Sequence, residues 1–181
     1  MTAAHFVEGE VSFDAPNGGK PSSTWYRVLG SLEDSQLPDL VTLHGGPSAG
    51  HEYLSSLADL HKDYGIPIVF YDQAGCGKST HYLEKMGDTS FWTFDLFIQE
   101  LDNLVDHLKL REKGFFLLGQ SWGGMLGAIY ATQHPKGLLK LIIASSLASF
   151  TFFVVGNEQL LSQLPDNIRE SLKSTDHNTH E

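Results

Sequence analysis

The segment Gly119-Gln120-Ser121-Trp122-Gly123 directly follows an apolar run, residues 115–118, and directly precedes a helix-like stretch. A serine that attacks a carbonyl carbon has to stand on a tight turn between a strand and a helix. Glycines two residues to either side remove the Cβ atoms that would collide in such a turn, and the start of the helix stabilises negative charge. The segment therefore predicts that Ser121 is a nucleophile. The alternative, a glycine-rich turn with an incidental serine, is disfavoured by the strand before it and the helix after it.

A second glycine-rich stretch, His44-Gly45-Gly46-Pro47, also follows a predicted strand, residues 40–43. Ligands of parallel sheets bind at the carboxyl ends of the strands. Acyl transfer needs backbone N–H groups aimed at the developing oxyanion, and we predict that Gly46 and Trp122 supply them. Taken alone, the stretch is equally compatible with a plain tight turn. Because the predicted nucleophile segment follows two strands later in the chain, the interpretation as part of an oxyanion hole is the simpler of the two.

A third stretch, Asp72-Gln73-Ala74-Gly75-Cys76-Gly77-Lys78-Ser79, suggests a different class of protein, because it ends like the phosphate-binding loop of nucleotide hydrolases. That loop needs a glycine at the position that Asp72 occupies, where backbone amides have to face a phosphate. A nucleotide hydrolase is therefore disfavoured. We interpret the stretch as a tight connection that lines the rim of the active site.

Outward from these motifs, predicted strands and helices alternate along the chain. The strands cover residues 40–43, 66–71, 115–118 and 138–144, and the helices cover residues 52–64, 92–108 and 125–133. Such alternation predicts an α/β fold with a mostly parallel sheet that is covered by helices on both faces. Two earlier runs, residues 6–13 and 24–29, flank a cluster of turn formers and predict an antiparallel hairpin.

Apolar residues recur at three- and four-residue steps in the predicted helix 92–108, which indicates one buried face. Asp95, Glu100, Asp102 and Asp106 lie largely off this stripe, so we expect them on the solvent side. Beyond Ser149 the pattern predicts two short amphipathic helices, residues 157–164 and 167–172, and then a polar tail.

The composition excludes several classes of partner. A length of 181 residues fits one globular domain, and 12 basic against 22 acidic residues leave a net charge of −10. This charge disfavours nucleic acid and anionic membranes as partners, and the apolar runs are too short and interrupted to span a bilayer. The single cysteine, Cys76, forms no internal disulfide, and no secretion signal is evident, so we expect a cytoplasmic location.

The order of these motifs resembles the proline iminopeptidases (prolyl aminopeptidases) of the α/β-hydrolase superfamily, particularly their fungal members. The resemblance covers residues 1 to about 165. Its supporting stretches are Thr24-Trp25-Tyr26, Gly50-His51-Glu52-Tyr53-Leu54 and Gly87-Asp88-Thr89-Ser90-Phe91-Trp92. The resemblance implies a serine aminopeptidase that releases an N-terminal residue, often proline, from small peptides or amino-acid amides. An acyl-enzyme would form on Ser121, without a metal or cofactor.

Two residues depart from the family pattern, which usually has glycine where this chain has Ser48 and a basic residue where it has Ala74. A larger departure concerns length, because the family places its catalytic acid and histidine beyond a helical cap that follows the strand at residues 138–144. The resemblance therefore implies that residues 1–148 form the N-terminal part of the hydrolase core. Residues 149–181 would be the beginning of the cap and a polar tail.

The residues after Ser121 offer few substitutes for a catalytic acid and base. General-base catalysis needs an imidazole held within hydrogen-bond reach of the serine, and none of the candidates lies on a predicted strand or in a fixed register. The histidines are His134, His177 and His180, all three of which we interpret as surface residues, and the only aspartates are Asp166 and Asp176.

Three functions remain open. The first is a serine aminopeptidase, represented by a fragment or short product that does not turn over substrate by itself. The second is another ester or amide hydrolase of the same fold. The third is a catalytically inactive product that acts only by binding, and we expect self-association through an exposed sheet edge at Leu141, Ile142 and Ile143.

Overall fold

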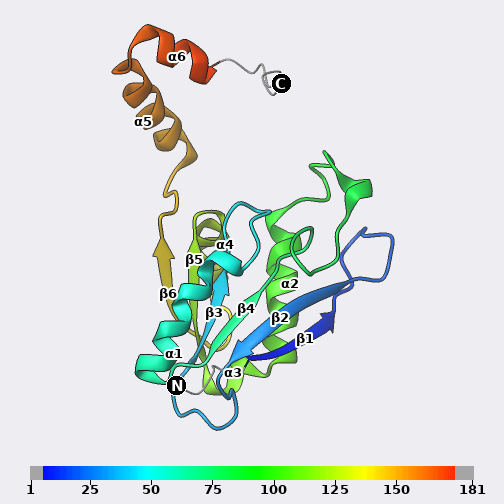
Figure 1. Cartoon of the computed structure of the whole chain (residues 1–181). Helices are drawn as coiled ribbons and strands as arrows, with labels where there is room; N and C mark the ends of the chain where they lie inside the picture. Colours follow the sequence, from blue (N-terminus) through cyan, green and yellow to red (C-terminus); the bar gives the residue numbers. More distant parts are fainter. Residues whose placement is uncertain (1–5, 174–181) are drawn as a thin grey trace. The chain divides into compact units, whose positions relative to one another are not determined.

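The computed structural model describes residues 6–173. The first part of the chain is built on a six-stranded sheet in the order β1-β2-β4-β3-β5-β6 (Figure 1). The strands are β1 (Phe6–Ser12), β2 (Ser23–Leu29), β3 (Asp39–Leu43), β4 (Ile68–Tyr71), β5 (Phe115–Gln120) and β6 (Leu138–Ala144). β1 pairs antiparallel with β2 and β2 antiparallel with β4, whereas β3 runs parallel to both β4 and β5, and β5 runs parallel to β6. The predicted α/β-hydrolase type of sheet, mostly parallel with an N-terminal hairpin, is confirmed.

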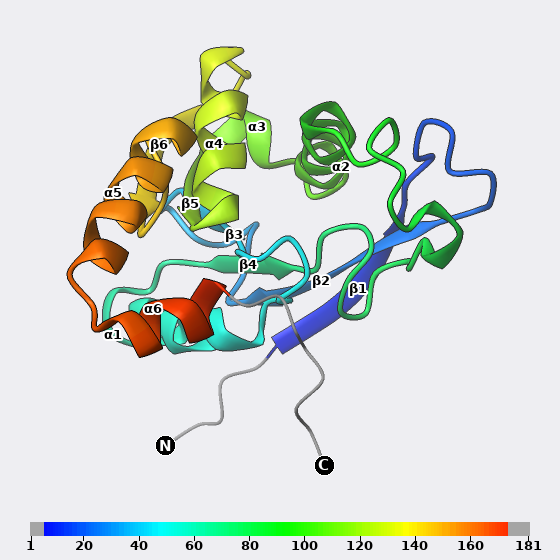
Figure 2. The same cartoon turned by 90° about the horizontal axis from the view of Figure 1, so that it is seen from above.

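Helices cover both faces of this sheet, as predicted. The helices of the first part of the chain are η1 (Glu52–Leu57), α1 (Ala58–Tyr64), η2 (Leu83–Lys85), α2 (Phe94–His107), α3 (Leu110–Lys113) and α4 (Trp122–Thr132). Two further helices, α5 (Phe150–Ser162) and α6 (Asp166–Lys173), follow later in the chain. Figure 2 shows α2 and α4 on one face of the sheet and α1 on the other. The central strands β3 and β4 are buried along their whole length because helices lie on both sides of them.

Two apolar clusters hold the helices to the sheet. The larger packs α2 and α4 against the sheet and includes Val41, Leu43, Leu101, Leu117 and Leu126, each completely buried. The smaller lies on the α1 face and comprises Leu29, Leu40, Leu54, Ile68 and Phe70. At about 25 cal/mol per Å² of apolar surface removed from water, these clusters are the main stabilising contribution to the first part of the chain.

Several helix boundaries differ from the sequence-based expectation. α4 begins at Trp122, three residues before the predicted start, because the turn at Ser121 sets the first helical residue. α5 begins at Phe150, so the apolar run that precedes Asn157 is its first two turns. Ser149 explains this start, since its side chain accepts a hydrogen bond from the backbone N–H of Phe152 as an N-cap.

The chain divides into two compact units, of which the first ends at Ser146 and the second begins at Leu147. The second unit contains α5 and α6, whose described side chains are almost all exposed. Its interpretation as the beginning of a helical cap stays a prediction. Among residues 6–173, no helix has the length and apolar composition needed to cross a membrane.

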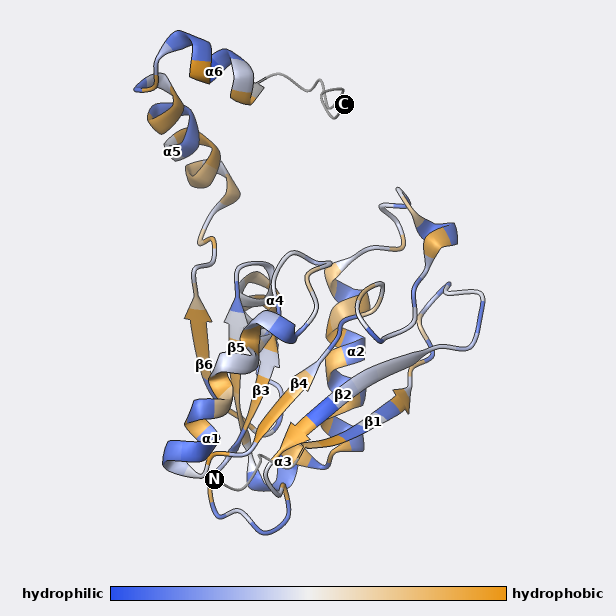
Figure 3. Cartoon of the chain, viewed as in Figure 1, coloured by the Kyte–Doolittle hydropathy of each residue, from blue (hydrophilic) through white to orange (hydrophobic). Residues whose placement is uncertain are grey.

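β6 forms one edge of the sheet and carries apolar side chains that face solvent, and its ribbon is strongly hydrophobic in Figure 3. Leu139, Ile142 and Ile143 are 53%, 43% and 53% exposed. Leu141 differs, because it is partly buried against the core under α4. The predicted uncovered edge is therefore present for Ile142 and Ile143, while self-association through it stays a prediction.

Candidate active site

Ser121 lies between the end of β5 and the start of α4, as predicted. Its backbone angles, φ 55° and ψ −118°, are uncommon for a residue with a side chain and are typical of strained functional positions. The surrounding chain holds this conformation: the Ser121 N–H donates to the carbonyl of Ala144 across 3.0 Å, and the Ser121 carbonyl accepts from Ser146 Oγ at 2.7 Å and from Gly124 N–H at 3.0 Å. The sharp turn is thus tied both to the neighbouring strand and to its own helix.

The glycines on either side of Ser121 are required by close backbone contacts. A Cβ at Gly119 would lie 2.2 Å from the carbonyl oxygen of Gly123, and a Cβ at Gly123 would lie 2.2 Å from that of Leu43. Neither oxygen can move without shifting a strand or a helix. These contacts support the argument, made from the sequence, that glycine clears space around the turn.

The turn His44-Gly45-Gly46-Pro47 lies directly against the Ser121 turn. A Cβ at Gly45 would lie 3.0 Å from the Cβ of Ser121. Gly46 adopts φ +89°, which favours glycine. Within residues 6–173, the N–H groups of Gly46 and Trp122 donate to no protein acceptor. Both groups therefore remain available for an oxyanion, and their role in an oxyanion hole stays a prediction.

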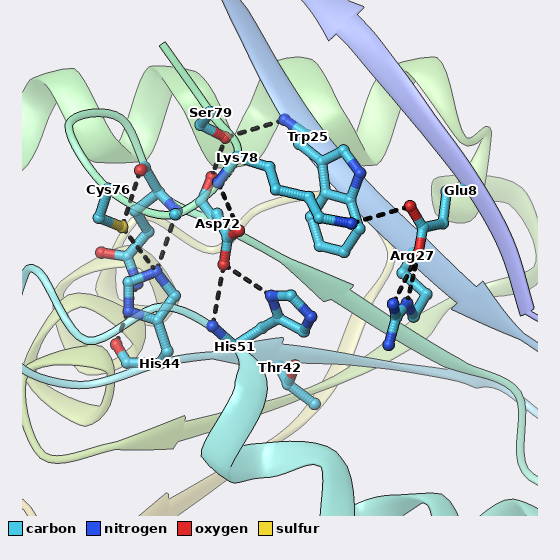
Figure 4. A network of polar contacts seen from close by, with 12 residues as sticks. Glu8, Trp25, Arg27, Thr42, His44, His51, Asp72, Cys76, Lys78 and Ser79 are labelled. Atoms are coloured by element: carbon cyan, nitrogen blue, oxygen red, sulfur yellow. Dashed lines mark hydrogen bonds and ion pairs between the residues drawn. The ribbon is translucent and has the colours of Figure 1, made fainter. Parts of the chain in front are cut away.

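His44 is completely buried and pins this turn to the loop that follows β4 (Figure 4). Its Nε2 accepts the N–H of Gln73 at 2.9 Å, which leaves the proton on Nδ1, where it is donated to the Gly45 carbonyl at 3.0 Å. Burial lowers the pKa of His44. The ring is therefore neutral and has both nitrogens engaged, so it is a structural group and has no free nitrogen to accept a proton from Ser121.

Gln73 connects the same loop to the helix behind the nucleophile. Its Nε2 donates to the His44 carbonyl at 3.0 Å, and its Oε1 accepts from the indole N–H of Trp122 at 2.9 Å. The three turns at the ends of β3, β4 and β5 are thus joined by one side chain.

The carboxylate of Asp72 organises the rest of this loop. It accepts the backbone N–H and Nδ1 of His51 at 2.9 and 2.8 Å, and the backbone N–H of Lys78 at 2.9 Å. Burial raises the pKa of Asp72, but the hydrogen bonds from His51 and Lys78 outweigh it and leave the pKa below its usual value. Because the backbone N–H of Lys78 already donates to the Asp72 carboxylate, this loop does not serve as a phosphate-binding loop.

Glu52 adds a third potential ligand atom close to His51 and Asp72, with the three atoms within 4.8 Å of one another. The Asp72 oxygens and His51 Nδ1 are, however, the atoms engaged in the loop's own hydrogen bonds. Lys78 Nζ pairs with Glu8 across 3.0 Å, away from the loop's amides (Figure 4). The hydrogen bonds between His51 and Asp72 therefore account for the closeness of these two possible metal ligands.

A pocket of about 420 Å³ opens beside the Ser121 turn. It is lined by Pro47, Ser48, Ala74, Gly75, Trp92, Phe97 and Trp122. Trp92 and Phe97 are stacked with ring centroids 6.2 Å apart, and Phe97 meets Trp122 edge to face at 5.5 Å. The two residues that depart from the family pattern, Ser48 and Ala74, both line this pocket. The site can therefore hold a small apolar group next to the candidate nucleophile.

Glu100 contradicts the expectation that it faces solvent, because it is completely buried. Its Oε1 accepts from Thr24 Oγ1 at 2.6 Å and its Oε2 from the N–H of Ala74 at 2.9 Å. The stripe pattern of α2 could not reveal this position, because the loop after β4 and the strand β2 cover that side of the helix. Asp95 and Asp106 are exposed, as expected, whereas Asp102 is partly buried, and both Asp102 and Asp106 pair with Arg111.

The described residues offer no catalytic base for Ser121. His134 is exposed and follows the far end of α4, whose 11 residues span roughly 16 Å. Asp166 is exposed and pairs with Arg169. His134 is thus a surface residue, as expected, and His177, His180 and Asp176 lie outside the described residues. Within residues 6–173, no histidine ring hydrogen-bonds to Ser121.

Known proteins match this chain in sequence. The profile of the alpha/beta hydrolase fold family matches residues 38–179. A protein named proline iminopeptidase from Lactobacillus helveticus is 40% identical over 160 residues, which are 88% of this chain and 50% of the relative. A proline iminopeptidase from Saccharolobus solfataricus is 41% identical over 148 residues, 82% of this chain and 44% of the relative.

Solved structures show the same similarity. VinJ superimposes with a TM-score of 0.81 and 41% identity, covering 92% of this chain and 52% of VinJ. A proline iminopeptidase from Mycobacterium smegmatis gives a TM-score of 0.76 and 34% identity, with 91% and 52% covered. The resemblance to proline iminopeptidases inferred from the motifs is confirmed, while the particular likeness to fungal members stays a prediction. The chain spans about half the length of the curated relatives it matches.

Proposed function

Because this chain belongs to the alpha/beta hydrolase fold family, we propose that it carries the nucleophile and the oxyanion hole of a serine aminopeptidase. The activity proposed for the whole protein is release of an N-terminal residue, often proline, from peptides or amino-acid amides. One observation carries the proposal: Ser121 stands on a strained turn between β5 and α4, in contact with the glycine turn that follows β3. The names of relatives at about 40% identity support this substrate class.

In this proposal Ser121 Oγ attacks the carbonyl carbon of the N-terminal residue. The carbonyl oxygen becomes an oxyanion, which accepts hydrogen bonds from the N–H groups of Gly46 and Trp122. The amine of the next residue leaves with a proton, and water then hydrolyses the ester on Ser121. The start of α4 directly behind Ser121 favours the negative charge that develops in both steps.

Proton transfer from Ser121 needs a positioned imidazole. Since none of the described histidines contacts Ser121, the proposal places that base outside residues 6–173. Because we interpret His177 and His180 as surface residues, we expect residues 1–181 alone to give no measurable turnover of a proline amide. An oxyanion hole without its base accelerates the reaction only about 10³–10⁴-fold over water.

The apolar pocket beside Ser121 would receive the side chain or ring of the N-terminal residue. Its walls are aromatic, and Ser48 and Ala74 contribute only small side chains. Burial of a compact apolar ring there contributes binding energy in proportion to the area removed from water. A substrate with a charged N-terminal side chain would leave that charge without a partner among the lining residues.

A fluorophosphonate probe tests this assignment in an active form of the protein. We expect the label on the peptide that contains Ser121 and its loss in Ser121→Ala, together with loss of fluorophore release from a proline amide. Ser31 is exposed and lies at the opposite end of the sheet strands. Ser31→Ala is therefore the matched control, and the probe should label it at Ser121 as it labels the unsubstituted protein. Labelling that survives Ser121→Ala would contradict the proposal. Faster release from esters or other amides would instead assign a different hydrolase reaction to the same site.

A further inference from the structure

The hydroxyl of Tyr53 bridges the two turns of the candidate active site. It accepts the backbone N–H of Gly45 across 2.6 Å and donates to the side-chain oxygen Oε1 of Gln120 across 2.7 Å. Gln120 is the last residue of β5 and immediately precedes Ser121. A single side chain from the short helix η1 therefore links the glycine turn after β3 to the nucleophile turn after β5.

Packing does not explain why Tyr53 takes this position. The residue is 46% exposed and is not a member of the apolar clusters that hold the helices to the sheet. The hydroxyl nevertheless satisfies a backbone N–H that has no partner in a strand or helix. A phenylalanine would fill the same space and bury the same ring, but it would lose both hydrogen bonds.

The Tyr53 hydroxyl links the turns after β3 and β5 at a point where their atoms lie close together. A Cβ at Gly45 would lie 2.6 Å from Gln120 Oε1 and 3.0 Å from the Cβ of Ser121. The N–H of Gly45 donates to the Tyr53 hydroxyl and is therefore not free for a ligand. The next N–H along the turn, that of Gly46, remains available. The orientation of that group depends on a turn that is held from one side by Tyr53 and from the other by His44.

We propose that Tyr53 is a positioning residue of the oxyanion hole, which clamps Gly45 to Gln120 and thereby holds the N–H of Gly46 at Ser121. This inference rests on the proposed function. Oxyanion donors act only when they are preorganised, and a displacement of about 1 Å costs on the order of 10²-fold in rate. Loss of the clamp should therefore lower kcat and leave KM almost unchanged, since the apolar pocket is not touched.

The test compares Tyr53→Phe with Tyr64→Phe in the full-length protein. Tyr64 is 68% exposed at the end of α1 and is the matched control for removing one tyrosine hydroxyl. Hydrogen–deuterium exchange, resolved by residue, is measured at the Gly45 amide, and kcat and KM are measured with a proline amide. Melting temperatures of both variants show whether either change acts through global stability.

In Tyr53→Phe we expect the Gly45 amide to exchange about tenfold faster, which corresponds to losing one ordinary hydrogen bond. We expect kcat to fall about tenfold or more with KM within about twofold, and no change in Tyr64→Phe. Unchanged exchange at Gly45, or an unchanged kcat, overturns the inference. If the unsubstituted protein does not cleave the amide, the proposed function fails, and exchange at Gly45 alone then decides whether the clamp exists.

Discussion

Glu100, buried in the middle of α2, accepts a hydrogen bond from the backbone N–H of Ala74 across 2.9 Å, and Ala74 lines the pocket beside Ser121. A core helix thus holds one wall of the candidate active site through a carboxylate. Burial raises the pKa of Glu100 to about 7, and the hydrogen bonds from Thr24 and Ala74 only partly oppose this effect. The protonation state of a group in the core therefore changes within the neutral range.

The first prediction concerns stability against pH. Because the pKa of Glu100 is higher in the folded chain than its ordinary value of 4.5, the folded state binds more protons between these values. Glu100 therefore lowers the free energy of unfolding as pH rises from about 4.5 to about 7, by up to about 3 kcal/mol. Glu100→Gln, which resembles the protonated acid, should flatten this dependence. The measurement is urea unfolding at several pH values, and an unaltered slope would show that Glu100 does not titrate there.

The second prediction concerns the turn glycines. Gly123→Ala should destabilise the protein by roughly 1–3 kcal/mol, because the new Cβ meets the backbone of Leu43 at 2.2 Å. Gly156→Ala is the matched control, since nothing lies within 4 Å of its added Cβ in α5. The control should stabilise its helix slightly, by up to about 1 kcal/mol. Equal midpoints in chemical denaturation for the two variants would contradict the close approach of α4 to β3.

The third prediction addresses Gly46. Its φ of +89° is strained for any other residue, and an added Cβ would come within 3.0 Å of the Ala49 nitrogen. Gly46→Ala should displace the N–H and lower kcat about 10²–10³-fold in an active form of the protein, the usual effect of removing one oxyanion donor. Steady-state kinetics together with a circular dichroism spectrum separate this from unfolding. A folded variant with normal kcat would remove Gly46 from the oxyanion hole.

The fourth prediction concerns residues 1–181 as an isolated chain. Among residues 6–173, β6 is an edge strand that carries the exposed side chains of Ile142 and Ile143, and an apolar edge strand favours pairing with another molecule. We expect size-exclusion chromatography to show self-association that Ile143→Lys reduces. Leu83→Lys, at a residue 72% exposed in η2, introduces the same charge away from the strand edge and should have no effect. A monodisperse monomer would exclude association through β6.

Sequence reasoning succeeded where the decisive contacts are local. β6 begins and ends at the predicted residues, because its apolar run lies between a proline-glycine stretch and a pair of serines. The Ser121 turn was found because strand, glycines and helix are adjacent in the chain. In contrast, the early start of α4 was missed, because Trp122 and two glycines form its first turn and only tertiary packing makes them helical.

The missed members of the site are those that act across long distances in sequence. Glu100 contacts Ala74 and Thr24, which lie 26 and 76 residues away. Tyr53 contacts Gln120 over 67 residues. Neither residue carries a local signal, because an acid on a helix and a tyrosine after a turn are ordinary surface patterns. Only the arrangement of the sheet brings them to the Ser121 turn.

The buried ring of His44 has a consequence for experiments that look for the catalytic base by mutagenesis. Replacing the ring would remove the hydrogen bond that it accepts from the Gln73 N–H in the loop after β4, so we expect turnover to fall although no proton acceptor has been removed. A scan that ranks histidines by lost turnover would therefore select the wrong imidazole. The distinction has to come from titration, because burial lowers the pKa of the His44 ring and its Nδ1 proton is donated to Gly45, so its ionisation lies below that of an ordinary histidine base.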